Sequence, residues 1–487
     1  MAIWTLKGDG KTLALGDVVA PHERLSWGKT IGLGAQHVVA MFGATFVFPL
    51  IMGLNPQLAI MMSGIATILF LLIVKGKVPS YLGTSASFVG AVAAIRAQEG
   101  ATTARVTGAI MIAGLLLAAV GVLIHFAGPN VLHRVLPPAV TGAVVMLIGF
   151  NLAPVVAGVY WPQDQWVALS TMIFTIVCAV AFRGFISRIA VFLALIFGTT
   201  LSWVLDKTSG QINSVLGGAS EATDHFRTNF SGVGTADWFG LPAKTMMGAD
   251  GKEVVGWHLP SFSMAAILLV IPAVIALVAE NTGHVKAVAE MTGADLDPYM
   301  GRAIIGDGIG TALAAGVGGS PTTTYAENIG VMAATRVYST AAYYVAALVA
   351  IVFGFSPKFG QLVFAIPGGV LGGITVVLYG MIGLLGAKIW KENGVDFGNP
   401  INLVPLAAGI VMGIGNVTLT FSDSFSLTGI ALGTIVAVLG WHLAKALAPA
   451  ELRTGAEHPG AAIAVGDFVY GDSDGVDDLY QGDRPAR

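Results

Sequence analysis

The chain has 487 residues, of which 55% are hydrophobic and only 11% are charged. Soluble globular domains carry roughly 25% charged residues, so this composition indicates a protein embedded in a membrane. The net charge of −3 gives no reason to expect a nucleic-acid partner. With a single cysteine, Cys178, the chain cannot build a disulfide framework or a cysteine-based zinc site.

Apolar segments recur along the chain, and fourteen of them are candidate membrane spans. A spanning helix needs about 20 mostly apolar residues. The third and tenth candidates are shorter, and each follows a stretch rich in Gly, Ser, Thr and Pro, so neither crosses the bilayer as an unbroken helix. The fourteen ranges are 29–52, 56–74, 83–95, 106–127, 136–158, 166–182, 187–205, 261–283, 300–317, 322–334, 337–355, 362–386, 400–416 and 424–447.

Polar segments separate and flank two seven-span units, 29–206 and 261–448. Residues 1–28 precede them, residues 207–260 form a long loop between them, and the Gly/Asp-rich tail 449–487 is expected to be disordered. Most lysines and arginines fall on the cytoplasmic side when both termini are placed there, as the positive-inside rule requires. The pattern predicts a multi-pass protein of the cytoplasmic (inner) membrane with an external loop.

An internal repeat relates the two units. The segment LPPAVTGAVVMLIG (136–149) resembles IPGGVLGGITVVLYG (366–380), and these segments begin the fifth and twelfth spans. The two short spans are also seven spans apart, and a unit with an odd number of spans must enter the membrane inverted. Inverted repeats with broken helices are typical of secondary transporters, whose substrates bind near the breaks. Chance similarity between Gly-rich apolar segments is the alternative.

Glu280 and His284 are two of the few ionisable residues within the apolar segments. A charge at the bilayer centre costs on the order of several kcal/mol, so such residues are functional candidates. The two are four residues apart and share one helix face. They could hold a polar ligand and pass a proton, or they could form a structural ion pair between helices.

Glu327 follows the break GGSPTTTYA at the start of the tenth span. A break leaves backbone N–H groups without helical partners, so a carboxylate beside them offers an acceptor and donors together. A planar heterocycle with alternating N–H and C=O groups would match that pattern. The alternative is that Glu327 only caps its own helix.

The equivalent break in the first unit contains Ser85, Ala86 and Ser87, which offer backbone N–H groups and small side chains. Asp307, in the ninth span, is expected to hold the binding helices in place by hydrogen bonds. His37, in the first span, is expected to be a buried packing residue that finds a hydrogen-bond partner.

The run ENIGVMAATR (327–336) resembles the signature of the nucleobase–ascorbate transporter family, which reads Glu, Gln or Pro, then Asn-x-Gly, four residues, Thr, and Arg, Lys or Gly. The longer run TTTYAENIGVMAATRVYS resembles the family's bacterial uracil permeases in particular. The resemblance extends over about 29–448. Further matching runs are QHVVAMFGATFVFPL (36–50), GKVPSYLGTSASF (76–88), FRGF (182–185) and AENTGH (279–284).

This resemblance implies an all-α polytopic fold of fourteen segments in two inverted seven-span repeats. Short strands would begin the broken third and tenth spans. A core domain would hold spans one to four and eight to eleven, and a gate domain would hold the rest. The resemblance also implies a homodimer and proton-coupled uptake, with no cofactor beyond the proton.

The family's site residues map onto positions of this chain one by one. By resemblance, Glu280 and Glu327 contact the base, His284 with Glu280 couples the proton, and backbone groups at Ala86 and Ala326 face the substrate. The uracil permeases carry Phe where this chain has Ala86 and Gly where it has Ala326. The expected substrate-binding residues are Glu280, Glu327, Ala86, Ala326, Ser85 and Tyr325, and the supporting residues are Asp307, Asn328 and His37.

The predicted function is proton-coupled import of uracil or a close pyrimidine. Glu at position 327 favours a pyrimidine, because purine members of the family usually carry Gln there. A purine carrier for xanthine or urate is the alternative within the family, and the small Ala86 leaves room for a larger base. A channel or an intramembrane enzyme is the alternative of another class, but the sequence has no HExxH or GxSxG motif to support an enzyme.

Overall fold

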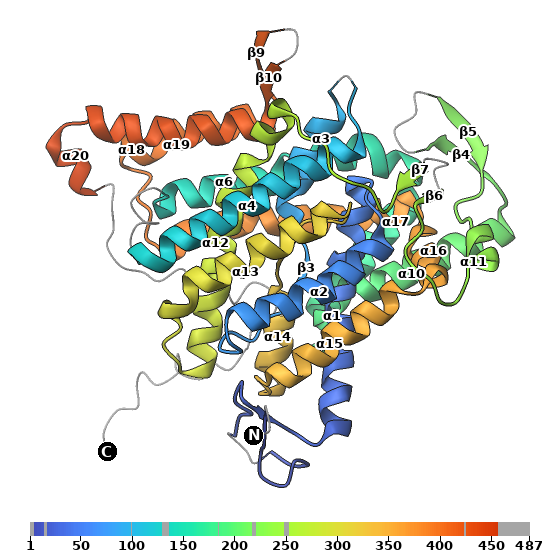
Figure 1. Cartoon of the computed structure of the whole chain (residues 1–487). Helices are drawn as coiled ribbons and strands as arrows, with labels where there is room; N and C mark the ends of the chain where they lie inside the picture. The colour runs from blue at the N-terminus through green and yellow to red at the C-terminus, as the bar shows by residue number, and fades with distance from the viewer. Residues whose placement is uncertain are drawn as a thin grey trace, which may run out of the picture.

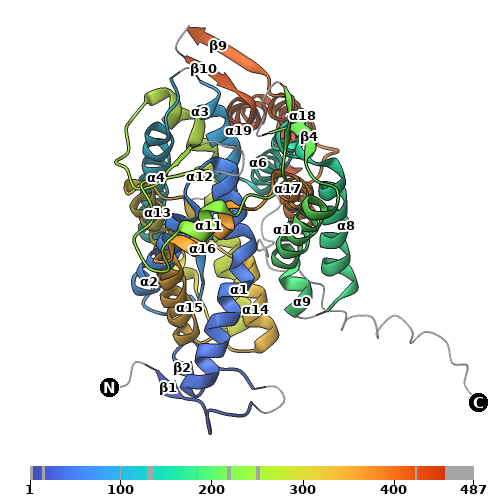
Figure 2. The same ribbon diagram turned by 90° about the vertical axis from the view of Figure 1, so that its right-hand side faces the viewer.

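The computed structural model describes residues 4–13, 17–98, 100–128, 136–183, 185–216, 221–247, 253–422 and 425–455. The predicted tail beyond 455 therefore lies outside the described residues. The described chain is mostly helical, and its helices pack as two groups that lie side by side (Figures 1 and 2).

The first helix group contains elements from both halves of the chain, and these contact one another closely. In Figure 2 it forms the left-hand side of the molecule. Its elements are α1 (Trp27–Met52), α2 (Pro56–Ile73), β3 (Leu82–Thr84), η1 (Ala86–Phe88), α3 (Val89–Arg96), α4 (Thr103–Ala127), α12 (Met264–Thr292), α13 (Asp297–Gly316), β8 (Thr322–Thr324), α14 (Ala326–Thr335), α15 (Thr340–Gly354) and α16 (Pro357–Phe364).

The second helix group also combines both halves, with α6 against α17 and α18, and α8 against α10 and α17. It forms the right-hand side of Figure 2. Its elements are α6 (Pro138–Phe150), α7 (Ala153–Val155), η2 (Val156–Tyr160), η3 (Trp161–Gln163), α8 (Gln165–Ala181), α9 (Phe185–Arg188), α10 (Ala190–Thr208), α17 (Gly368–Glu392), α18 (Pro400–Ile414), α19 (Gly429–Leu447) and α20 (Ala450–Gly455).

Glycines allow the helix pairs within each group to approach closely. A Cβ atom added at Gly149 of α6 would lie 2.2 Å from the backbone nitrogen of Gly383 in α17. A Cβ at Gly308 of α13 would lie 2.4 Å from the backbone nitrogen of Ala118 in α4. Small residues at such crossings let backbones touch in lipid, where apolar side chains alone give helices no preference for one another.

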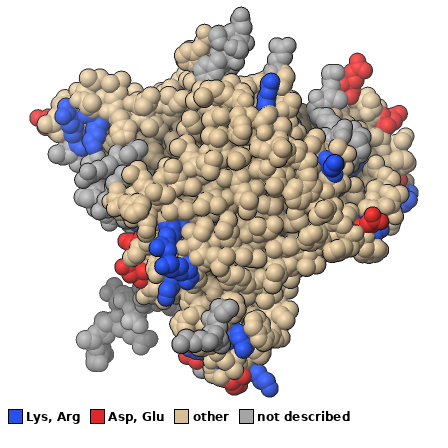
Figure 3. Space-filling view, viewed as in Figure 1, with Lys and Arg blue, Asp and Glu red and all other residues tan. Residues whose placement is uncertain are grey.

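The molecule's outer surface is that of a membrane protein. Eight described helices are long and apolar enough to cross a bilayer, and the pair α15–α16, bent by 85°, adds a ninth if it is one span. Large apolar side chains such as Phe126, Val180 and Leu439 are more than 60% exposed. In Figure 3 charged residues lie around the periphery of a broad uncharged middle. The chain is therefore a multi-pass membrane protein.

All fourteen predicted ranges overlap a helix, but several boundaries differ. The predicted range 362–386 is wrong at its start, because α16 ends at Phe364 and α17 begins after Pro367, whose fixed φ suits a helix entry. The predicted range 424–447 is also wrong at its start, because Phe425–Thr428 is strand β10, which pairs with β9 (Thr418–Ser422). After α6, short α, π and 3₁₀ turns continue to Gln163 rather than ending at 158.

The loop 207–260 contains more structure than its composition indicates. It forms two antiparallel hairpins, β4–β5 (Ile212–Val215, Ala222–His225) and β6–β7 (Thr245–Met247, Glu253–Val255), with the short helix α11 (Ser231–Thr235) between them. At the N-terminus, β1 (Thr5–Leu6) pairs with β2 (Glu23–Arg24). The predicted tail begins with the short helix α20.

Candidate functional site

Two short strands meet in the middle of the first helix group, as the resemblance predicts for the third and tenth segments. β3 pairs antiparallel with β8, with Gly83 opposite Thr323 at the centre of the register. Beyond the strands, Ser85 N–H donates to the Pro321 carbonyl oxygen, and Tyr325 N–H donates to the Tyr81 carbonyl oxygen. The pattern is symmetric about Gly83 and Thr323, so η1 and α14 begin at opposite ends of one short strand pair.

Threonine hydroxyls satisfy the outer edges of this sheet. The Leu82 N–H donates to Thr67 Oγ1 at 2.9 Å, and the Thr322 N–H donates to Thr311 Oγ1 at 3.0 Å. Non-helical backbone is tolerated at membrane depth only where protein or water satisfies its polar groups. These buried threonines of α2 and α13 therefore allow the helices to be broken here.

Partial exposure distinguishes four of the predicted site residues from their neighbours. Ala86 is the only residue between Val78 and Val92 that is not buried. Glu280 is likewise the only residue between Ala276 and Val285 that is not buried. Residues 318–325 are buried, but Ala326 and Glu327, which follow, are partly exposed. These four partly exposed residues lie on η1, α12 and α14, and α12 contacts both of the other elements.

The acidic side chains come together at this spot. Glu280 of α12 lies close enough to Glu327 of α14 and Asp307 of α13 for their charges to interact. The helix α12 contacts β8, α14 and η1, which explains how three segments distant in sequence supply one site. Like charges this close in low dielectric repel strongly, so the site favours a proton or a donor-rich ligand between them.

The start of η1 is capped by a side chain, whereas the start of α14 has no side-chain cap among the described residues. Ser85 Oγ accepts from the Ser87 N–H at 3.3 Å, and Ser85 is fully buried. Capping thus accounts for part of what Ser85 does, while the N–H groups of Ala86 and Ala326 belong to the first turns, which lack helical acceptors.

Tyr325 holds the two strands together. Its hydroxyl donates to the Thr84 carbonyl oxygen at 2.8 Å and accepts from Thr45 Oγ1 at 3.2 Å. The side chain is 4% exposed, and its ring lies directly over Gly83. A substrate contact from Tyr325 would therefore have to come from its ring edge or backbone rather than from its hydroxyl.

His284 and Asp307 lie in one buried hydrogen-bonded chain. His284 Nδ1 is 2.7 Å from Thr324 Oγ1, and Asn281 Nδ2 donates to Asp307 Oδ2 at 2.6 Å. The buried Thr323 hydroxyl lies within reach of the Glu280 and Asp307 carboxyl groups. The hydrogen bond from Asn281 to Asp307 joins α12 to α13.

His37 and Asn328 lie outside this hydrogen-bonded network, and their contacts connect α1 to α14. Asn328 Nδ2 donates to the His37 carbonyl oxygen at 3.0 Å and lies 3.2 Å from His37 Nδ1. The His37 ring packs on Tyr343 with centroids 4.4 Å apart, and the Tyr343 hydroxyl donates to the Asn328 carbonyl oxygen. His37 is therefore a buried residue with hydrogen-bond and ring-packing partners.

Asn281, Thr323 and Thr324 are site residues that sequence reasoning missed. All three are at most 2% exposed, and Asn281 and Thr324 link Asp307 to His284 by hydrogen bonds. Their signal was present in the printed motifs: Asn281 directly follows Glu280, and the threonines precede Tyr325 in the break. Polar residues at these positions need partners in a dry interior, and that requirement could have indicated them.

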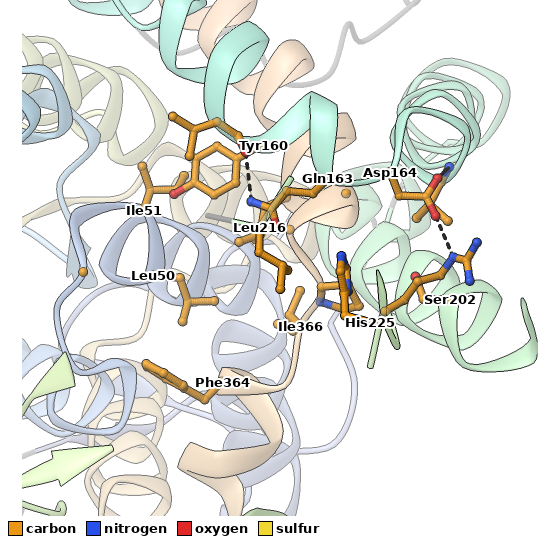
Figure 4. A pocket seen from close by; sticks show the side chains of 18 of the residues that line it. Leu50, Ile51, Tyr160, Gln163, Asp164, Ser202, Leu216, His225, Phe364 and Ile366 are labelled. Carbon is orange, nitrogen blue, oxygen red and sulfur yellow. Dashed lines mark hydrogen bonds and ion pairs between the residues drawn. The ribbon is translucent and has the colours of Figure 1, made fainter. Parts of the chain in front are cut away.

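A separate cavity of about 290 Å³ lies between the two helix groups, at the end of α1 remote from the N-terminus (Figure 4). It contains none of the predicted site residues. Its walls come from both groups and from the loop 207–260, and they include Leu50, Tyr160, Gln163, His225 and Phe364.

An ion-pair cluster closes one side of this cavity. Arg227 of the loop donates from Nε to Asp164 at 2.7 Å and from Nη1 to Asp206 at 3.3 Å. Asp164 also caps α8 by accepting from the Trp166 and Val167 N–H groups. The cluster anchors the long loop to the second helix group.

Comparison with known proteins shows the family of this chain. Residues 28–421 match the Permease family of xanthine and uracil permeases. The chain belongs to the nucleobase–ascorbate transporter family. It is 44% identical over 442 residues to a candidate pyrimidine permease, RutG, from Escherichia coli (strain K12), covering 90% of this chain and 93% of that one.

Uracil permeases are among the other relatives. The uracil permease of Bacillus caldolyticus is 36% identical over 427 residues, covering 86% of this chain and 92% of the relative. That of Bacillus subtilis (strain 168) is 33% identical over 442 residues, covering 88% and 94%. The prediction of a permease rather than an enzyme is thereby confirmed.

Solved structures share the fold at low sequence identity. The transmembrane domain of the cyanobacterial bicarbonate transporter BicA superposes with a TM-score of 0.54 at 15% identity, covering 85% of this chain and 96% of that one. The murine anion transporter Slc26a9 in its inward-facing state gives 0.58 at 11% identity, covering 88% and 69%. At such identities the likeness shows a common transporter fold and carries nothing about substrate.

Proposed function

We propose that this permease imports uracil or a closely related pyrimidine nucleobase across the cytoplasmic membrane, coupled to protons. The observation that carries the proposal is the proximity of the Glu280 and Glu327 carboxyl groups, beside partly exposed residues at the starts of η1 and α14. The uracil permeases among its relatives support the substrate class.

The chemistry of the site suits a planar base with both donors and acceptors. The carboxylates of Glu280 and Glu327 would accept hydrogen bonds from two ring N–H groups, and the backbone N–H groups of Ala86 and Ala326 would donate to ring carbonyl oxygens. Hydrogen bonds to carboxylates contribute more than neutral ones. Ser85 and Tyr325 would support binding by holding η1 and β3 in place.

Proton coupling is proposed for His284 together with Glu280. Histidine changes charge near neutral pH, because its ordinary pKa is about 6.5. A proton taken up at this pair would reduce the repulsion among the three carboxylates. The loaded and empty sites would then differ in their preference for outward and inward states, and that difference drives transport.

The proposed transport cycle moves one helix group against the other. The first helix group, which holds the whole site, would be the core, and the second would be the gate. The symmetric β3–β8 register supports fourteen segments arranged as two inverted repeats. We further propose a homodimer with both termini in the cytoplasm, so that the loop 207–260 and the cavity beneath it face outside.

Substitution of Glu327 tests the assignment. Glu327→Ala should abolish uracil binding and uptake, since it removes a charged acceptor from a buried site, whereas His284→Ala should weaken coupling more than binding. Binding is measured as stabilisation of the purified protein by uracil, which follows from mass action. Glu392→Ala, which alters a carboxylate outside the site, serves as control. Normal proton-driven uracil uptake by Glu327→Ala would refute the site.

A purine such as xanthine or urate is the second candidate substrate. The observation that favours it is Ala86, whose methyl side chain is partly exposed at the site and leaves room beside the base. Competition against labelled uracil separates the two, because xanthine or urate should compete better than unlabelled uracil if the transporter is a purine carrier.

A further inference from the structure

The polar network behind the proposed site has a direction that its geometry determines. It runs from His284 through Thr324 and Asn281 to Asp307, with distances of 2.7, 3.2 and 2.6 Å. All four residues are at most 4% exposed. Buried polar hydrogens are expected to find acceptors, so the acceptors within the network determine where these hydrogens go.

The orientation of the Asn281 amide is fixed by two oxygen atoms beside its nitrogen. Its Nδ2 lies 2.9 Å from the Leu277 carbonyl oxygen, which can only accept, and 2.6 Å from Asp307 Oδ2. The amide nitrogen of Asn281 must therefore point toward Leu277 and Asp307, and its Oδ1 must point toward Thr324.

The orientation of the Asn281 amide determines where the Thr324 hydroxyl hydrogen points. Its single hydrogen donates to Asn281 Oδ1 at 3.2 Å, so its lone pairs face His284 Nδ1 at 2.7 Å. A lone pair facing a ring nitrogen requires that nitrogen to carry a hydrogen. His284 must then be protonated at Nδ1, and Nε2 is the nitrogen left to take up and release a proton.

We infer that Thr324 is a positioning residue for proton coupling: its hydroxyl holds His284 in the Nδ1–H tautomer and links it to Asp307 through Asn281. Thr324 is itself held in place, because it pairs with Leu82 in the β3–β8 sheet. An amide does not pass protons readily, so Asp307 orients the network rather than receiving the proton of His284. This inference rests on the proposed proton-coupled function.

The carboxyl groups around this part of α12 are those of Glu280 on the same helix, Asp307 on α13 and Glu327 on α14. Any of them could alter the pH profile of uptake. The tautomer of His284 is a sharper readout, because the carboxyl groups do not by themselves choose between the two ring nitrogens.

The experiment is ¹⁵N nuclear magnetic resonance of histidine-labelled protein in nanodiscs at about pH 8, above the ordinary histidine pKa. The signals of His284 among the nine histidines are assigned by their loss in His284→Gln. Wild-type His284 should be protonated at Nδ1. In Thr324→Val the ratio of the Nδ1–H to the Nε2–H form should fall by roughly five- to tenfold, as expected for one hydrogen bond. Thr324→Ser should restore it.

Transport measurements accompany the spectra. Thr324→Val should reduce proton-driven uracil accumulation about fivefold or more while uracil affinity changes less than about threefold, and Thr324→Ser should recover most of it. Thr282→Val is the matched control, because that buried hydroxyl of α12 donates to the Val278 carbonyl oxygen within its own helix. It should leave the tautomer and coupling unchanged.

Two results would overturn the inference: wild-type His284 protonated at Nε2, or an unchanged tautomer ratio in Thr324→Val. The wild-type spectrum needs no folded Thr324 variant, so the idea stays testable if that variant is unstable. If wild-type protein shows no stabilisation by uracil, the proposed function fails, but the tautomer assignment stands or falls separately.

Discussion

Replacing Gly83 with alanine tests whether the strand crossing positions the site. An added Cβ would lie 2.3 Å from Tyr325 Cζ, 2.4 Å from Cε2 and 2.7 Å from Thr45 Oγ1. Non-bonded carbon atoms normally sit about 3.5–4.0 Å apart. Tyr325 cannot swing away, because it is buried and its hydroxyl is held by Thr84, so β3 must shift from β8 by more than 1 Å.

The size of the effect follows from two contributions. Overpacking a dense interior costs about 1–3 kcal/mol. If the shift also breaks the Tyr325–Thr84 hydrogen bond, the buried carbonyl is left unsatisfied at a further cost of about 1–3 kcal/mol. The same shift moves the Ala86 N–H, and losing one neutral hydrogen bond of about 1 kcal/mol weakens uracil binding about fivefold.

The assay compares thermal stability and uracil affinity of purified Gly83→Ala with those of Gly32→Ala, whose added Cβ meets nothing within 4 Å. The double variant Gly83→Ala/Tyr325→Leu should recover part of the lost stability, because the ring that causes the clash is gone. Such coupling between neighbours is measured by the departure from additivity. Gly83→Ala with wild-type stability and affinity would refute this reasoning.

Two further predictions concern the edges of the site. Arg227→Ala leaves two buried carboxylates unpaired, so it should destabilise the protein by up to about 3 kcal/mol and expose the loop 207–260 to protease, whereas the exposed Lys207→Ala should do neither. Equal digestion rates would contradict the anchoring role. Asn328→Ala removes two contacts to His37 and should weaken uracil binding several-fold by loosening α14, while Asn328→Asp should not restore it, because a carboxylate cannot donate.

Much of the fold could be predicted from hydropathy, because spans are long and their apolar character is a property of single residues. The short third and tenth segments were recognisable for the same reason. What hydropathy could not provide was the start of α17 after Pro367, the strand Phe425–Thr428 or the hairpins of the loop. Those depend on turn geometry and strand pairing, which average hydrophobicity does not record.

For the site, the rarity of charges indicated Glu280 and Glu327, and the structure brings them into electrostatic contact. Sequence alone could not show that the Tyr325 hydroxyl donates a hydrogen bond to the Thr84 carbonyl oxygen, because the two residues are 241 positions apart. Nor could it reveal Thr324, since a threonine is common in any break. Its importance appears only when its partners on α12 are known.

The strand pairing has a consequence for how the site could move. Each broken segment supplies an N–H-rich helix start, and each is bonded to the other through Tyr81, Pro321 and the Tyr325 hydroxyl. α12 is joined to the same unit through Thr324, and α1 through His37. Opening the site by separating β3 from β8 would break several buried hydrogen bonds at about 1 kcal/mol or more each. Moving the whole first helix group against the second breaks none of them. The proposed motion is therefore one of rigid groups, in which the binding geometry is carried intact and access changes around it.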